Sequence, residues 1–235
     1  MLHIHAEICQ ALLNRHNSLR IDYEYFVLPA LIVPQDDVSW GNRIVWLSAR
    51  ILQWMERGVR TEGEWHTLNQ LVDEWECERP AGFDAFFWQE QHMDAGGYFP
   101  ELWVSGGFHG KSSCNPSSLE TTLTDSISAD ANQHLRICRM ALASTSPHST
   151  DREVLAGLKE TIAIAHCNTH CLSAPWKAAH AVHKFAAVLH DDLDRSKMIE
   201  FLKEVNGMGM PTATSMEWLR EQWGWHWEGG LNVFQ

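Results

Sequence analysis

The sequence lacks an excess of basic residues. Among 235 residues, 18 lysines and arginines are outnumbered by 30 aspartates and glutamates, which gives a formal net charge of −12 at neutral pH. The basic residues form no run and do not alternate with aromatic residues, whereas surfaces that bind nucleic acid concentrate lysine and arginine to neutralise phosphates. The chain by itself is therefore predicted not to bind nucleic acid directly.

Clustered cysteines are also lacking. The six cysteines stand at positions 9, 77, 114, 138, 167 and 171, and only Cys167 and Cys171 lie one helical turn apart. A zinc-cluster DNA-binding module needs six cysteines in closely spaced pairs, within a few dozen residues and among basic side chains. Isolated cysteines of this kind instead predict free, mostly buried thiols in a reducing compartment.

Long apolar runs and the common catalytic motifs are missing as well. No apolar run approaches the roughly 18 residues of a membrane-spanning helix, so the sequence predicts no membrane span. There is no Gly-x-Ser-x-Gly and no glycine-rich phosphate loop after a strand. The sequence therefore gives no support to a serine hydrolase or to a phosphate-loop enzyme.

Apolar residues at helical spacing are what the sequence does contain. They make up 45% of the chain and include 12 tryptophans, which we expect to pack mainly in the core. Ile44, Leu47 and Ile51 mark the buried face of one helix, and Leu68 and Val72 mark that of the next. The repeated pattern predicts an all-α fold, an irregular multi-helix array of amphipathic helices in a single domain over residues 1–235.

Several element boundaries can be predicted. Helices are expected at residues 3–14 and 129–143, and capping boxes at Thr61, Thr150 and Thr214 should each begin another. No alternating strand pattern is present, so the glycine- and serine-rich segment around residues 81–128 is predicted to be a long loop region. Four inward-facing side chains should be buried: Trp65, Trp75, Ile162 and Trp218.

Histidines and cysteines near residue 170 have the spacing of metal ligands. His166 and His170 are one turn apart on a predicted helix, and Cys167 and Cys171 repeat that spacing, which suits zinc. No His-Glu-x-x-His pattern accompanies them, so they are interpreted as structural. The same holds for the histidines of the following helix: His180, His183 and His190. No catalytic, cofactor-binding or metal-binding residue is assigned, and no ligand-binding residue can be named.

Asp191, Asp192 and Asp194 form an acidic group that invites a different interpretation. Helical terpenoid cyclases hold Mg²⁺ on a carboxylate cluster, which makes a small all-helical enzyme of secondary metabolism, terpenoid-cyclase-like or metal-dependent, the alternative function. The spacing differs from the usual Asp-Asp-x-x-Asp, and no second metal motif follows. A loop between two helices, with Asp194 as the helix cap, is the favoured interpretation.

Segments in order along the chain resemble the fungal-specific transcription factor domain, the regulatory region of fungal zinc-cluster transcription factors. His-Ala-Glu-Ile at 5–8 stands where the family has Arg-Gln-Asp/Glu-Ile, and the helix pair at 40–80 ends on Glu-Arg-Pro. Phe-Pro-Glu-Leu-Trp at 99–103 resembles the family's Phe-Pro turn. The segments 164–168 and 216–225 resemble its two closing helices.

This chain departs from the family pattern at His5 and Ala6, which replace Arg-Gln, and at Ala85, where a proline is common. The resemblance implies a non-catalytic regulatory domain that acts in transcription in the nucleus, without binding DNA itself and with an unknown small-molecule effector.

The resemblance also implies that the domain is N-terminally incomplete, since the motif at 5–8 normally falls well inside the regulatory region. The first helix would then lack packing partners. Ile4, Ile8 and Leu12 would be partly exposed, and this surface would be available to a protein partner or to self-association.

Overall fold

The computed structural model describes residues 2–13, 36–57, 59–90, 97–104, 119–146 and 151–225. Within these ranges the chain is mostly helical, which confirms the all-α class. The elements, in order, are α1 (Leu2–Leu13), α2 (Asp37–Glu56), α3 (Glu62–Glu78), the 3₁₀ turn η1 (Ala81–Phe83), β1 (Ala85–Gln89), β2 (Glu101–Val104), α4 (Leu119–Thr145), α5 (Asp151–Cys167), α6 (Ala174–Phe185), the 3₁₀ turn η3 (Ala186–Val188), α7 (Asp192–Gly207) and α8 (Ala213–Gln222).

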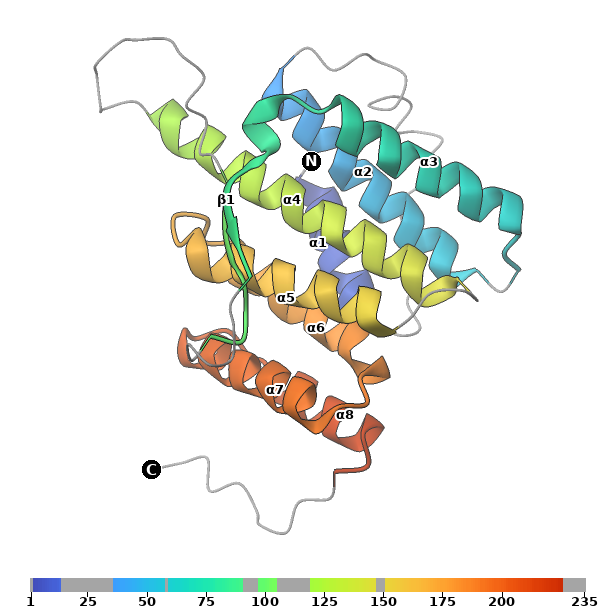
Figure 1. Ribbon diagram of the computed structural model, residues 1–235, viewed down its shortest axis with the longest axis vertical. Coiled ribbons are helices and arrows are strands. Elements are labelled where there is room, and N and C mark those ends of the chain that lie inside the picture. Colours follow the sequence, from blue (N-terminus) through green and yellow to red (C-terminus); the bar gives the residue numbers. More distant parts are fainter. Residues whose placement is uncertain are drawn as a thin grey trace.

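The helices are stacked in layers (Figure 1). α2, α3 and α4 lie at one end of the molecule, α5 and α6 in the middle, and α7 and α8 at the other end, while the β1–β2 hairpin runs along one side. α4 is the central element, since it packs against α2, α3, α5 and α6. None of the described helices is long and apolar enough to cross a membrane.

The first helix is buried, contrary to the sequence-based expectation. α1 packs against both α2 and α6, and Ile4, Ile8 and Leu12 are 3%, 1% and 1% exposed. Its apolar stripe is covered by α2 and by α6, and the contact with α6, which follows much later in the sequence, could not be revealed by a local pattern. The predicted exposure of Ile4, Ile8 and Leu12 is therefore wrong.

The helix caps agree with the sequence in part. Thr61 caps α3 as predicted, because its hydroxyl accepts from the Glu64 N–H at 3.2 Å and the Glu64 carboxylate accepts from the Thr61 N–H at 3.0 Å. Thr150 lies outside the described residues. The predicted cap at Thr214 is wrong: α8 begins at Ala213, and Thr212, at the cap position, donates its hydroxyl to the Leu202 carbonyl at 2.6 Å.

The Asp194 cap is also corrected. Asp191 caps α7, since its carboxylate accepts from the N–H groups of Leu193 and Asp194 at 2.9 and 3.0 Å. Of the side chains expected in the core, Trp75 and Ile162 are fully buried, whereas Trp65 and Trp218 are only partly buried.

The long loop predicted around residues 81–128 contains regular structure. α4 begins at Leu119, ten residues before the expected start, and β1 pairs antiparallel with β2. The first ten residues of α4 are rich in serine and threonine, which are weak helix formers, so their pattern does not predict a helix. β1 is exposed at all five positions, so it lacks the alternation that marks a half-buried strand.

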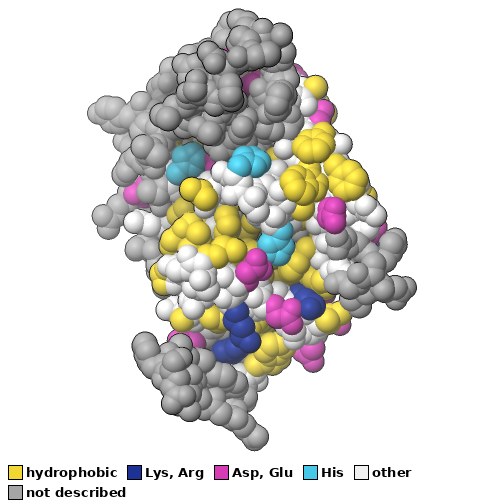
Figure 2. Space-filling view, turned by 90° about the vertical axis from the view of Figure 1, so that its left-hand side faces the viewer, with side chains coloured by type: hydrophobic (Ala, Val, Ile, Leu, Met, Phe, Trp, Pro, Cys, Tyr) yellow, Lys and Arg dark blue, Asp and Glu magenta, His cyan; other side chains and the backbone are white. Residues whose placement is uncertain are grey.

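The hairpin places large aromatic side chains on the surface. Phe86, Trp88 and Trp103 are 68%, 55% and 41% exposed, and Phe87 pairs across the strands with Trp103. Figure 2 shows hydrophobic side chains gathered on this side of the molecule. The expectation that the tryptophans mainly pack the core is thus correct for several of them and wrong for those of the hairpin.

Candidate functional site

The histidine and cysteine positions near residue 170 do not form a ligand group. The imidazole Nε2 of His166 lies 3.1 Å from the Glu204 carboxylate, and its ring packs between Phe99 and Phe201. His170 is exposed, while Cys171 is buried with its sulfur 3.5 Å from the Ser173 hydroxyl. Among the described residues, the one group of three side chains close enough to share a metal ion lies elsewhere.

The acidic group at residues 191–194 is occupied with structural contacts. Asp191 caps α7, and Asp192 pairs with Arg195 at 3.4 Å. Asp194 accepts a hydrogen bond from the Tyr98 hydroxyl and lies 3.8 Å from the Lys159 amine. Burial, together with Asp194, raises the pKa of Tyr98, which keeps the phenol protonated as the donor. These carboxylates point to different partners and do not converge on one cation.

The histidines of α6 lie on its buried side. His180 packs beside Trp176, with ring centroids 5.6 Å apart, and His183 beside Trp218, with centroids 4.7 Å apart. Burial, followed by His183 and Lys177, lowers the pKa of His180 to about 4. Both histidines are therefore part of the packing between α6 and its neighbours.

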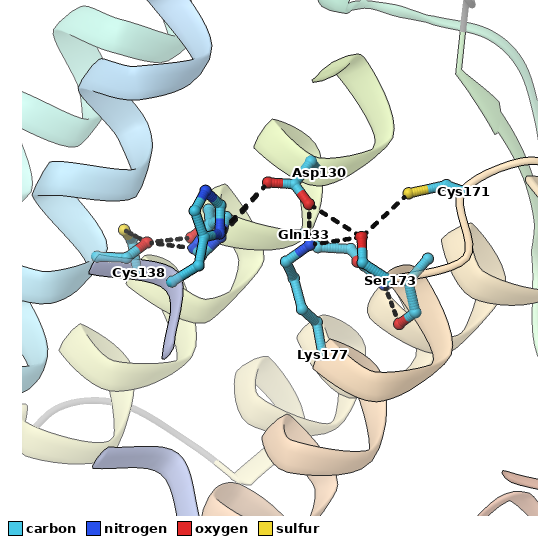
Figure 3. Close-up of polar contacts among 10 residues, drawn as sticks. Asp130, Gln133, Cys138, Cys171, Ser173 and Lys177 are labelled. Carbon is cyan, nitrogen blue, oxygen red and sulfur yellow. Dashed lines mark hydrogen bonds and ion pairs between the residues drawn. The ribbon is translucent and has the colours of Figure 1, made fainter. Parts of the chain in front are cut away.

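A polar cluster lies among α1, α4 and α6, where the surrounding core is apolar (Figure 3). α4 supplies Asp130 and His134, which are four residues apart and so point to the same side of the helix. α1 contributes His5, whose ring lies against that of His134 with centroids 5.2 Å apart. The Asp130 Oδ2 atom lies 3.8 Å from His5 Nδ1 and 3.7 Å from His134 Nε2.

The second oxygen of Asp130 has different partners. The Lys177 amine of α6 forms a close ion pair with Asp130 Oδ1, and the Ser173 hydroxyl donates to the same oxygen at 3.3 Å. Lys177 also donates to the Ser173 hydroxyl at 3.0 Å. Figure 3 shows Asp130 facing Lys177 and Ser173 on this side. The two oxygens of one carboxylate therefore serve two separate groups.

Hydrogen bonds to Ser48 fix the orientation of the His134 ring. The Ser48 hydroxyl donates to the His134 carbonyl at 3.1 Å and lies 3.2 Å from both His134 Nδ1 and the Cys138 sulfur. When its one proton is used on the carbonyl, the hydroxyl is left to accept from the other two groups. In the tautomer that carries its proton on Nδ1, His134 donates to this hydroxyl and its Nε2 lone pair faces Asp130 and His5.

Burial determines the charges of the cluster. Burial and the nearby His5 hold the pKa of His134 well below its usual value. Burial, followed by Lys177, lowers the pKa of His5 to about 4. Both imidazoles are therefore neutral near pH 7. Burial lowers the pKa of Lys177 to about 8, while the adjacent Asp130 carboxylate favours the charged amine.

This arrangement can hold a cation but does not suit a substrate. His134 is 1% exposed and the Lys177 side chain 6%, so a substrate could not reach them without separating the helices. The Nε2 atom of His134 has no hydrogen-bond partner among the described residues. A buried acceptor without a donor is costly, which makes this atom the unexplained part of the cluster.

Sequence reasoning missed this cluster. His5 was noted only as a departure from a family motif, and Asp130 and His134 were not singled out, although they lie at i, i+4 within a predicted helix. That spacing of an acid and a histidine on an apolar face was the available signal. The approach of α1 to α4 was not predictable, because His5 and Asp130 stand 125 positions apart in the sequence.

The chain matches no known protein family, no curated protein and no solved structure.

Proposed function

We propose that this chain is a non-catalytic regulatory domain of the fungal zinc-cluster transcription factor type, which acts in the nucleus without binding DNA itself. The observation that carries the proposal is that segments chosen for their resemblance to that family contact each other across long distances in the sequence. Such motifs would then represent the packing points of a common helical scaffold.

The clearest example joins the segments 99–103 and 164–168. The Asn168 side chain donates to the Leu102 carbonyl at 3.0 Å and accepts from the Val104 N–H at 3.2 Å. The rings of Phe99 and His166 pack edge to face with centroids 5.5 Å apart. Two motifs about 60 residues apart therefore form one junction between the hairpin and α5.

A second example lies within the helix pair. The Trp75 indole donates to the Trp40 carbonyl at 2.9 Å, and the Arg79 guanidinium lies over the Trp75 ring, 5.5 Å from its centroid. Arg79 also donates to Asn132 of α4 at 3.2 Å and to Asp84 at 3.1 Å. The Glu-Arg-Pro ending of this motif thus fastens α3 to α4.

The acidic balance of the chain and the contacts of residues 191–194 fit a regulatory role better than the enzyme alternative. The acidic balance of the chain disfavours contact with phosphates. The acidic residues at 191–194 are engaged in capping and pairing, so no specific observation favours a cyclase-like metal cluster. A regulatory domain needs neither contact with phosphates nor a catalytic metal cluster.

A transcription reporter tests the proposal. The chain is fused to an unrelated zinc-cluster DNA-binding module that carries an activation segment, and reporter output in yeast is compared with that of the module alone. We expect the fused chain to change the output in either direction, while the affinity of the purified fusion for its DNA site stays the same.

Two controls make the result specific. A fusion of the Trp75→Ala variant, expressed at the same level, should lose the effect because its core is disrupted. A fusion of an unrelated acidic helical domain of equal length should leave the reporter output unchanged. Reporter output that is the same with the wild-type chain and with the unrelated domain would refute the regulatory function.

A further inference from the structure

We propose that His5, Asp130 and His134 form a binding site for one divalent transition-metal ion of the zinc class, which fastens α1 to α4. The three ligand atoms come from two helices and lie within 4.8 Å of one another. The site does not depend on the regulatory function proposed above, and the chain can have either property without the other.

The distances suit a metal better than hydrogen bonds. The two contacts to Asp130 Oδ2, at 3.7 and 3.8 Å, are longer than the roughly 2.7–3.2 Å of a hydrogen bond. Ligands about 2.0–2.1 Å from a tetrahedral zinc ion lie about 3.4 Å from each other. The two separations from Asp130 Oδ2 exceed this value by only a few tenths of an ångström, and all three ligand atoms lie within 4.8 Å of one another, so a side-chain rotation has to bring them to the coordination distance.

The surroundings of His134 match those of a metal ligand. Its Nδ1 lies 3.2 Å from the Ser48 hydroxyl, and this contact positions the ring with Nε2 facing the site. Metal-binding histidines generally donate their second ring nitrogen to such an outer partner. Nε2 itself is buried and has no hydrogen-bond partner among the described residues. A bound cation would satisfy this nitrogen and the adjacent Asp130 oxygen together.

Asp130 divides its two oxygens between the metal site and Lys177. Lys177 and Ser173 both contact Oδ1, so Oδ2 remains available on the side of the histidines. Lys177 nevertheless opposes a metal ion, because it places a positive charge close to the same carboxylate. Replacing Lys177 with an apolar residue should therefore tighten metal binding.

The ligand set indicates the class of metal. Two imidazole nitrogens and one carboxylate oxygen suit zinc and its first-row neighbours, whereas calcium and magnesium prefer sites made of oxygen atoms. Three protein ligands leave the fourth tetrahedral position to water. His5 is partly exposed, with 28% of its side chain accessible, which provides a route for the ion.

Metal binding to the full chain, first stripped with a chelator, tests the site. Calorimetric titration with zinc chloride should give one equivalent, and cobalt chloride should give the visible absorption bands of a four-coordinate site with nitrogen and oxygen ligands. The midpoint of thermal unfolding should rise by roughly 5–10 °C at a zinc concentration 100 times the Kd. Absence of zinc binding and of the cobalt spectrum would refute the proposal.

Variants locate the ion. His5→Gln and Asp130→Asn should each abolish stoichiometric binding, and Lys177→Met should strengthen it by about tenfold or more. His66→Gln is the matched control, because that histidine is exposed, pairs with Glu62 in its own helix turn and packs beside the adjacent Trp65 ring. Circular dichroism of the metal-free variants verifies folding, and the cobalt spectrum of the wild-type chain keeps the test valid if one variant does not fold.

A double replacement, His166→Gln with His170→Gln, separates this site from the pair considered in the sequence. Binding should persist in that variant. Loss of zinc there, with retention in His5→Gln, would contradict the proposed site.

Discussion

The indole N–H of Trp75 donates to the backbone carbonyl of Trp40 at 2.9 Å, and the two rings pack edge to face with centroids 6.4 Å apart. Trp75 is fully buried, and on its other side it contacts Phe83 of η1 with centroids 5.7 Å apart. One side chain of α3 thus ties the start of α2 to the turn that leads into the hairpin.

Replacing Trp75 by Ala should destabilise the fold by about 3–5 kcal/mol, because the change opens a cavity and removes the hydrogen bond to Trp40. The free energy of unfolding is measured by urea denaturation followed by circular dichroism. Trp88→Ala is the matched control: this tryptophan is 55% exposed, and its loss should cost less than about 1 kcal/mol. Equal losses for the two variants would contradict the assignment of Trp75 to the core.

Gly157→Ala should destabilise the fold by about 1–3 kcal/mol, although alanine is the better helix former. A β-carbon at this position of α5 would lie 2.6 Å from the Cγ atom of buried Met140 on α4. Gly63→Ala, where the added carbon meets no atom within 4 Å, should be neutral or mildly stabilising. Thermal unfolding of both variants checks the difference, and a stabilised Gly157→Ala would mean that α4 and α5 are not so closely packed.

As the pH is lowered below about 6.5, the free energy of unfolding should decrease because of His180. Its pKa is lowered to about 4 in the folded state, so between about 4 and 6.5 the unfolded chain binds a proton that the folded chain does not. The contribution of His180 to the free energy of unfolding is therefore complete above pH 6.5, and about 3 kcal/mol of it is lost as the pH falls to 4. Urea denaturation of chelator-treated protein should show this slope, reduced in His180→Gln and unchanged in the exposed-site variant His66→Gln.

Asn168→Ala should loosen the hairpin and cost about 2–4 kcal/mol, since it leaves the Leu102 carbonyl and the Val104 N–H without their partner. Hydrogen exchange at Val104 should become faster. Gln70→Ala serves as the comparison, because that exposed side chain bonds Glu74 within its own helix. Unchanged protection of the Val104 amide from exchange would mean that other contacts hold the hairpin in place.

The purified chain should not bind duplex DNA near physiological salt, because its formal charge is −12 and lysine and arginine are not clustered. Fluorescence anisotropy with a labelled duplex measures this. A salt-dependent affinity in the micromolar range would overturn the prediction.

Helices with a continuous apolar stripe were predictable from the sequence, as α2 and the Thr61 cap of α3 illustrate. Elements stabilised mainly by distant contacts were not. The first turns of α4 are polar, and β1 has no buried face, so neither has a local signal. The same limit applied to the candidate site, since His5 and Asp130 stand on helices that are far apart in the sequence.

Asn168 occupies the outer edge of β2 in the way that a neighbouring strand would, by bonding one carbonyl and one N–H that point away from β1. The small sheet is consequently closed on that side. Among the described strands, the opposite edge, along Ala85–Gln89, has no further partner. Any extended segment that adds a third strand to this sheet must therefore pair with β1, beside the exposed Phe86 and Trp88.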